Sequence, residues 1–350
     1  MARSKTYIAT PTGATIKEQL EYRGMSQREF AKRMDYSEKF ISQLINGQVE
    51  LTPNTAHRLE MVLGVPSSFW MNLEARYREK LLQVEDENSI EEDKQIARKF
   101  PYAQMAKLGW VESTRSVAVK VVELRKFFEV VRLALLNEDR LAPGIAYRRQ
   151  KETAESEYAL LAWAQKAKID AREITTGKIN VGKLEERISR LRELTTMDPT
   201  DFQALLVSML AECGIATVFL PHLEHTFLNG ATFYDGSKIV LALTLRGADA
   251  DKFWFSLFHE LAHVINGHIG RTTGTTEEEE RAADAFARDT LIPPEAYAQL
   301  VDGSKTRSSV ASFANEIGIA PGIVVGRLQK DGYLPYSQLN SLKVRYQFAE

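Results

Sequence analysis

The sequence predicts a multi-domain, mainly α-helical chain with one small sheet in its C-terminal part. Three observations support this prediction. Four short helical patterns fill residues 15–64, helical periodicity returns between residues 117 and 194, and three short runs of β-branched and aromatic residues follow residue 214. A chain of 350 residues is long enough for two or three domains. We expect boundaries that give domains at 1–80, 81–198 and 199–350.

The composition is that of a soluble globular protein, with 44% hydrophobic and 26% charged residues. We expect a cytoplasmic protein without a membrane partner, because the sequence has no 18-residue apolar run and no apolar core of a signal peptide. Cys213 is the only cysteine, which excludes an internal disulfide and a thiolate zinc cluster. The net charge of −2 gives no global sign of nucleic-acid binding, so that function must rest on a local motif.

The first such motif begins with a helical pattern that stops at Gly24. Ser26 and Glu29 form a capping-box pattern for a second helix, and Ser37 is placed to cap a third. Thr52 and the proline after it open a fourth helix. Two helices joined by a short turn at this spacing form a helix-turn-helix unit, whose second helix enters the DNA major groove.

The residues Ser26-Gln27, Phe30-Ala31 and Ile41-Ser42-Gln43-Leu44-Ile45-Asn46-Gly47 resemble the XRE (Cro/repressor-like) family, and Gly64-Val65-Pro66-Ser67-Ser68-Phe69-Trp70-Met71-Asn72-Leu73 is close to its HigA antitoxin branch. The resemblance implies a lambda-repressor-like bundle that binds double-stranded operator DNA. It also implies that Glu38, Lys39 and Gln43 face base edges, while Gln27 and Asn46 lie near phosphates. Gln can read adenine, Lys can reach guanine, and Glu can accept from cytosine.

The charge of this region argues against DNA binding. Residues 15–64 hold seven Lys or Arg and seven Asp or Glu, whereas a DNA-binding domain normally shows a basic footprint. Arg3 and Lys5 form a basic arm ahead of it, which softens the objection. A helical module that does not bind DNA remains the alternative.

The middle of the chain, residues 81–198, contains no motif that indicates a chemical function. Residues 85–93 form an acidic, polar run that is typical of a linker. Residues 146–150, Ala-Tyr-Arg-Arg-Gln, could contact phosphate, although a buried tyrosine beside solvated arginines is the preferred interpretation. We expect a helical spacer that also pairs subunits into a homodimer.

Strands are expected at residues 215–219, 232–234 and 239–243, with a hairpin turn at Asn229-Gly230. An edge strand of such a sheet can align an extended peptide. His225 and Tyr234 are candidates for stabilising an oxyanion, although surface or structural roles are commoner for such residues.

The stretch that follows the sheet, residues 255–268, contains His259-Glu260-Leu261-Ala262-His263. Residues four apart share one face of a helix, so both histidines can reach one metal ion. Glu260 then lies where it can take a proton from a water held by the metal. The alternative is a helix that carries two histidines by chance. His268 is expected at the C-terminal end of this helix, where the helix dipole favours it.

A catalytic zinc site usually has three protein ligands, and a second helical pattern at residues 277–287 offers the third. Glu280 and Asp284 lie four apart there. Glu280 can bind the metal, and Asp284 can accept the free N–H of a ligating histidine. The alternative is a solvated acidic first turn favoured by the helix dipole. The extended metzincin pattern fails, because its positions hold Asn266 and Ile269.

Residues 253–263, Glu280-x-x-Ala283-Asp284-x-Phe286-Ala287 and Leu291-Ile292-Pro293 together resemble the ImmA/IrrE family of metallo-endopeptidases, over roughly residues 200–350. The resemblance implies an α+β, zincin-like (gluzincin-type) domain that binds Zn²⁺ through His259, His263 and Glu280, with Glu260 as the general base. Asp284 replaces the commoner Asn. The helix-turn-helix pattern at residues 309–330 accompanies this peptidase, so we expect it to pack on that domain.

Two classes of function follow. The first is a HigA-antitoxin-like transcriptional regulator whose zinc-dependent endopeptidase domain cleaves a regulator or partner protein. The second is a non-catalytic antitoxin or autorepressor in which the zincin-like domain is a sensor or a toxin-binding module. The intact Glu260 favours the first, because a purely structural metal site has no use for that carboxylate.

Overall fold

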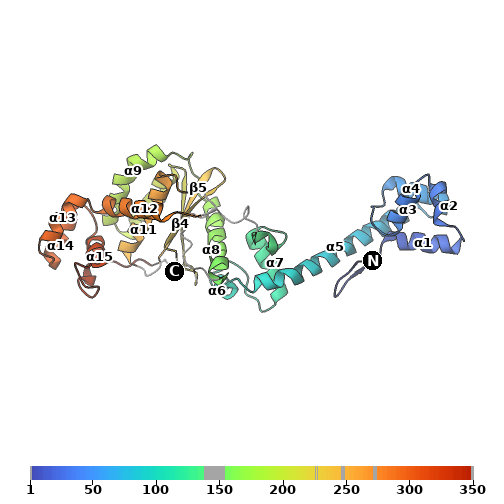
Figure 1. Cartoon of the computed structure of the whole chain (residues 1–350), viewed down its shortest axis with the longest axis horizontal. Helices are drawn as coiled ribbons and strands as arrows, with labels where there is room; N and C mark the ends of the chain where they lie inside the picture. Colours follow the sequence, from blue (N-terminus) through green and yellow to red (C-terminus); the bar gives the residue numbers. More distant parts are fainter. Residues whose placement is uncertain are drawn as a thin grey trace. The chain divides into compact units, whose positions relative to one another are not determined.

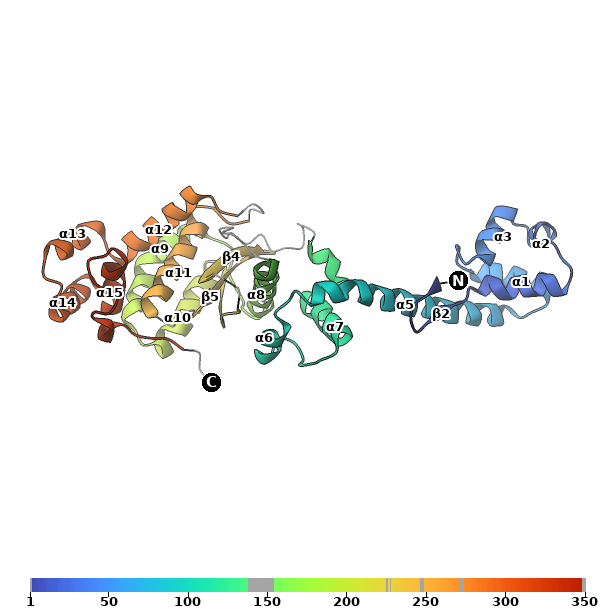
Figure 2. The ribbon, with the colours of Figure 1, turned by 60° about the horizontal axis from the view of Figure 1, so that its bottom comes forward.

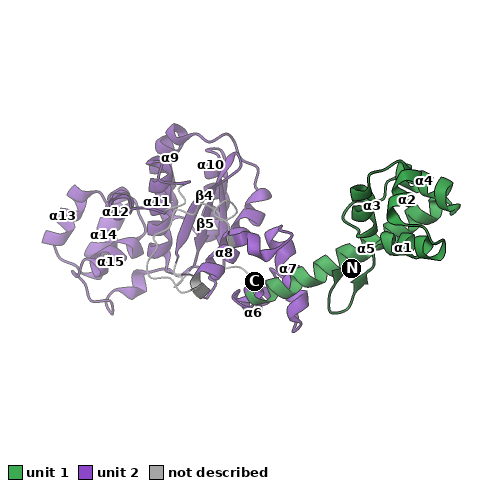
Figure 3. Cartoon of the chain, turned by 45° about the vertical axis from the view of Figure 1, so that its right-hand side comes forward, with its two compact units in different colours: residues 1–95 green, residues 96–350 purple. Residues whose placement is uncertain are grey.

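The computed structural model describes residues 2–137, 154–224, 226, 228–245, 249–270 and 274–347. They form two compact units, residues 1–95 and 96–350, which are coloured separately in Figure 3 and described separately below. Helices dominate both units, and the main sheet has three strands (Figure 1). The predicted multi-domain, mainly α-helical fold class with a small sheet is confirmed.

The first unit is built around four short helices, α1 (Thr12–Tyr22), α2 (Gln27–Met34), α3 (Glu38–Ile45) and α4 (Pro53–Leu63). Their core includes Ile16, Phe30, Ile41, Leu59 and Trp70, all fully buried. The predicted caps form: the side chains of Ser26, Ser37 and Thr52 accept the backbone N–H groups three residues ahead. The capping box is only half formed, because the Glu29 carboxylate pairs with Arg33.

The fifth helix, α5 (Ser67–Ala97), runs through residues 85–93, so the acidic run expected to be a linker is helical. The physical reason is that residues 67–97 contain neither glycine nor proline, and charged residues are compatible with an exposed helix. Strands β1 (Ala2–Arg3) and β2 (Ile8–Ala9) form a hairpin that is hydrogen-bonded to α5. The hydroxyl of Thr6 donates to Glu87 at 2.6 Å, so the expected basic arm is a hairpin held against a helix.

The sheet of the second unit has the order β3-β5-β4. Strand β3 (Ile215–Leu220) pairs in parallel with β5 (Lys238–Thr244), and β4 (Gly230–Asp235) pairs with β5 in the antiparallel sense. The predicted turn at Asn229-Gly230 is wrong, because Gly230 begins β4. The hairpin turn lies beyond Asp235, where Gly236 adopts φ +60°, a conformation that glycine tolerates.

Helices cover both faces of this sheet. Figures 1 and 2 show α8 (Ala154–Arg172) and α11 (Ala250–Ile265) on opposite sides of β5. Helix α8 lies within the stretch expected to be a spacer, yet it packs on β3 and β5. Its fully buried Ala159, Ala162 and Trp163 supply the apolar face that this packing needs. The expected boundaries at 80/81 and 198/199 stay predictions.

The second unit contains further α-helices besides α8 and α11. They are α6 (Tyr102–Lys107), α7 (Val117–Phe128), α9 (Val181–Glu193), α10 (Pro199–Ala211), α12 (Glu277–Leu291), α13 (Pro294–Asp302), α14 (Arg307–Ile317) and α15 (Pro321–Lys330). The buried Ala283 and Ala287 let α12 lie close against α11. Helix α15 also packs on α11, which confirms that the C-terminal helices join this unit.

No single helix in the described part of the chain is long and apolar enough to cross a membrane. The pair α14 and α15, bent by 115°, meets the length and composition criteria only when its two helices are counted together.

Candidate functional site

Helix α11 carries the two histidines of the motif one turn apart. The Nε2 atoms of His259 and His263 lie 3.1 Å from each other. His263 is almost fully buried, at 1% exposure, and Glu260 between them is buried at 6%. The helical spacing therefore brings both imidazoles to one point, as the motif predicts.

Helix α12 brings the third donor to the same point. The Glu280 carboxylate oxygens lie 3.4 Å from His259 Nε2 and 3.5 Å from His263 Nε2. A capping box between Thr276 and Glu279 fixes the start of this helix, and the Thr275 hydroxyl donates to Glu280. Glu280 therefore lies beside both histidines, whereas Glu279 caps the start of the helix.

This donor set fits a tetrahedral metal ion. Zinc bonds to nitrogen and oxygen of roughly 2.0–2.2 Å place two ligands of a tetrahedron about 3.3–3.6 Å apart. The two Nε2 atoms lie 3.1 Å apart, slightly closer than that, and the Glu280 oxygens lie at 3.4 Å (Oε2 to His259 Nε2) and 3.5 Å (Oε1 to His263 Nε2). Two imidazole nitrogens with one carboxylate are also a familiar set for catalytic zinc.

Each histidine has a second polar neighbour behind its ring. Asp284 Oδ1 lies 2.9 Å from His259 Nδ1, on the far side of the ring from the donor atoms, as predicted. His263 Nδ1 lies 3.1 Å from His268 Nδ1. His268 was expected at the helix end because of the helix dipole, and its contact with His263 was not predicted. Gly267, directly before His268, was the sequence signal that could have predicted this contact.

The Glu260 side chain contacts strand β4. Thr232 donates its hydroxyl to Glu260 Oε2 at 2.5 Å. Gly230, on the same face of β4, leaves room for the carboxylate, because a Cβ there would come within 2.9 Å of Glu260 Cγ. Burial raises the pKa of Glu260 to about 7. Thr232 and Gly230 were missed, since the strand register that aims them at Glu260 cannot be read from local sequence.

The pKa values of the three donor residues place one proton on His259. Burial disfavours a charged His259, but hydrogen bonds to Asp284 and Glu280 outweigh it and raise its pKa to about 10. Burial and the charge on His259 lower the pKa of His263 to about 4. Burial is likewise outweighed at Glu280, where hydrogen bonds from His259 and Thr275 lower the pKa to about 2. The site therefore holds a cation among carboxylates, and a metal ion can take that place.

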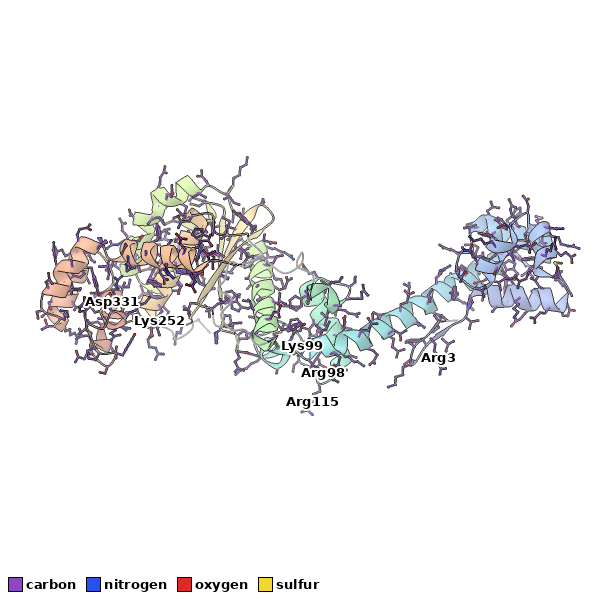
Figure 4. The ribbon with its side chains drawn as sticks, viewed as in Figure 1. Arg3, Arg98, Lys99, Arg115, Lys252 and Asp331 are labelled. Carbon is purple, nitrogen blue, oxygen red and sulfur yellow. The ribbon has the colours of Figure 1, made fainter. Side chains whose placement is uncertain are left out.

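A cavity of about 380 Å³ lies beside this site, between α11, α12 and α15. Phe255 and Asp284 line the end nearest His259, and Leu291 and Ile323 contribute apolar surface. Charged residues also line it, among them Lys252 and Asp331, which are labelled in Figure 4. The cavity can accept an amphipathic side chain next to the donor set.

The predicted DNA-contacting residues lie on α2 and α3 of the first unit, with Asn46 directly after α3. Gln27, Glu38, Lys39 and Asn46 are exposed, and Gln43 is half-buried. Two of them have partners within the chain: Glu38 lies 3.4 Å from Arg28 Nε, and the Asn46 side chain donates to the Ser42 carbonyl at 2.8 Å.

Two weaker candidates have different outcomes. Tyr234 lies on β4, is 48% exposed, and has its ring against Gly270. His225 and residues 146–150 lie outside the described residues.

Comparisons with known proteins match two regions of the chain. Residues 16–70 match the helix-turn-helix family, and residues 232–328 match the IrrE N-terminal-like domain family of M78 peptidases. An uncharacterized HTH-type transcriptional regulator, YddM, from Escherichia coli (strain K12) is 37% identical over 62 residues, which are 18% of this chain and 66% of that protein. The chain thus spans just under two thirds of that relative's length.

A solved structure of a HigA-family addiction module antidote protein from Coxiella burnetii is 27% identical, with 24% of this chain and 94% of that chain covered and a TM-score of 0.22. Together, the two family matches show that the chain joins an XRE-type helix-turn-helix domain near its N-terminus to an IrrE-like domain of the M78 peptidase family in its C-terminal half.

Proposed function

We propose that the chain is a DNA-binding transcriptional regulator whose IrrE-like domain is a zinc-dependent endopeptidase. The observation that carries this proposal is the position of Glu260. Its carboxylate is buried beside three donors that fit zinc, yet it is not one of them, and Thr232 holds it by a hydrogen bond of 2.5 Å. A structural metal site needs no such group.

The chemistry follows from these roles. A zinc ion bound by His259, His263 and Glu280 would polarise a peptide carbonyl and acidify a water molecule. Glu260 would accept the proton that the attacking water loses and deliver it to the leaving amine. A carboxyl whose pKa is raised to about 7 by burial can do both near neutral pH.

The sheet supports an extended protein substrate. Strand β4 forms one edge of the described sheet, so its outer backbone groups are placed to pair with a peptide. The Gly230 and Thr232 positions on this strand face Glu260, which puts such a peptide next to the general base. The substrate class that fits is an extended segment of a regulator or partner protein.

The helix-turn-helix domain supplies the regulatory half of the proposal. Helix α3 would lie in the major groove of operator DNA, where Lys39 and Gln43 read bases. A homodimer would recognise inverted half-sites.

The test is to express the wild-type chain and Glu260→Gln beside the proteins encoded next to its gene, and to map new protein N-termini by mass spectrometry. We expect one protein to be cut by the wild type and spared by Glu260→Gln, while both bind about one zinc per chain. His263→Ala should lose the metal, because two ligands rarely hold zinc. If wild type and Glu260→Gln leave the same proteins intact, including the chain itself, the domain is a non-catalytic sensor or toxin-binding module of an autorepressor.

A further inference from the structure

We propose that His268 is a positioning residue that fixes the tautomer and orientation of His263 by accepting its Nδ1 proton. This inference rests on the proposed zinc site, because it concerns the ring that presents a donor atom there. It assigns a role to a histidine that is neither in the H-E-x-x-H motif nor in the donor set.

The backbone places His268 against His263. Helix α11 ends at Ile265, and Gly267 adopts the left-handed conformation, with φ +68°. The backbone N–H of His268 donates to the His263 carbonyl at 2.9 Å, and that of Gly267 donates to the Val264 carbonyl at 3.2 Å. These two bonds define a Schellman motif, in which the residue after the glycine folds back over the last turn of the helix. The helix end therefore delivers the His268 side chain to the ligand histidine.

The contact lies on the side of His263 that faces away from the other donors. His263 Nε2 is 3.1 Å from His259 Nε2 and 3.5 Å from Glu280, whereas His263 Nδ1 is 3.1 Å from His268 Nδ1. The planes of the two rings are 61° apart, with centroids 5.3 Å from each other. His268 is thus placed to act on His263 and not to bind the metal directly.

The proton assignment follows from the chemistry of imidazole. A neutral imidazole has one N–H and one lone-pair nitrogen, so a His263 that offers Nε2 to a metal carries its proton on Nδ1. His263 is 1% exposed, so this N–H needs a partner within the protein. His268 Nδ1 is that acceptor and carries its own proton on Nε2. Without it, the buried N–H is unpaired or the proton moves to the nitrogen that must face the metal.

The arrangement parallels the one at His259, where Asp284 accepts from Nδ1. The two acceptors differ in charge. A second carboxylate behind His263 would add negative charge to a site that already contains Glu260, Glu280 and Asp284. A neutral imidazole orients the ligand without that addition.

The experiment compares His268→Leu with His268→Asn in the full-length chain. The Asn side chain places an oxygen at the same distance in bonds from Cα as Nδ1 of histidine, while Leu has a similar branched shape and no acceptor. Zinc affinity is measured by competition with a chromophoric chelator at one pH. We expect His268→Leu to bind zinc about 10–100-fold more weakly than wild type, and His268→Asn to lie within about threefold of it.

Two further measurements separate orientation from general damage. In ¹H–¹⁵N spectra of the zinc-loaded protein, the His263 Nδ1 proton should be protected from exchange in wild type and His268→Asn, and should exchange rapidly in His268→Leu. Circular dichroism of the variants should match wild type. His57→Leu, an exposed histidine change in the helix-turn-helix domain, should leave zinc affinity unaltered.

The outcomes distinguish this inference from the proposed function. A wild-type chain that binds no zinc overturns both. A wild type that binds zinc with His268→Leu equally tight, or with His268→Leu and His268→Asn equally weakened, overturns the positioning role alone and leaves the zinc site standing.

Discussion

Replacing Glu260 by Gln should stabilise the metal-free protein at neutral and alkaline pH. Glu260 is 6% exposed, and burial raises its pKa from 4.5 to about 7. The folded chain therefore resists ionisation of this carboxyl more strongly than the unfolded chain does. Gln has a similar shape and can still accept the Thr232 hydroxyl proton, but it carries no charge at any pH.

The size and sign of the effect follow from the pKa. One pKa unit corresponds to about 1.4 kcal/mol, so the ionised carboxylate costs the folded state about 3 kcal/mol. The folded-state pKa of Glu260 lies above the unfolded one. The wild-type chain therefore keeps its full stability below about pH 4.5, where the carboxyl is protonated in both states, and loses this contribution as the pH rises to about 7. The buried Gln amide N–H₂ groups offset part of the gain. We expect Glu260→Gln to be about 1–3 kcal/mol more stable at pH 8 and no more stable than wild type at pH 4.

Hydrogen exchange as a function of denaturant, in the presence of a chelator, measures this for each unit separately. Peptides from α11 report on the second unit, and peptides from α3 are the internal reference that should not change. Glu278→Gln, an exposed carboxyl in α12, is the matched control without a pH-dependent gain. A Glu260→Gln variant that is no more stable than wild type at pH 8, or whose advantage persists at pH 4, would refute the reasoning.

Three further predictions concern the donor set and the DNA contacts. Zinc must displace the proton that His259 binds with a pKa of about 10, which the hydrogen bonds to Asp284 and Glu280 raise. Zinc affinity should therefore rise about tenfold per pH unit between pH 7 and 9, and calorimetry in buffers of different ionisation enthalpy should detect about one released proton; no proton release would contradict this. Asp284→Ala should weaken zinc binding by about 10–100-fold in chelator competition, and wild-type affinity would remove its assigned role. Lys39→Ala and Gln43→Ala should each cost about 1–3 kcal/mol at the operator in fluorescence anisotropy with an unchanged circular dichroism spectrum, and undiminished binding by both would count against the α3 interface.

The parts of the fold that follow from local sequence were predictable. Caps at Ser26, Ser37 and Thr52 form as expected, because each depends on a side chain and a backbone N–H only three residues apart. His259 and His263 meet because a helix places residues four apart on one face. The role of Glu280 was predictable from the same helical spacing, because it lies four residues before Asp284 on a second helix.

The parts of the fold that depend on tertiary packing were not predictable from local sequence. Thr232 reaches Glu260 across 28 residues, and only the position of β4 against α11 brings them together. Helix α8 shows a helical period in the sequence, yet nothing in that period says that its apolar face covers a sheet. His268 is the exception. It lies five residues from His263, and the glycine at 267 marks a Schellman motif that would have predicted the contact.

The polar partners of the site indicate that folding and metal binding are separable in this chain. Asp284, His268 and Thr275 each hold one of the three donor side chains, and Thr232 holds the base. These bonds pair the buried polar groups with one another, so the metal is not needed to satisfy them. The second unit also has an extensive apolar core around α11, whereas small zinc domains fold only with metal because they lack one. We therefore expect the proposed zinc site to gain and lose its metal without unfolding of the second unit.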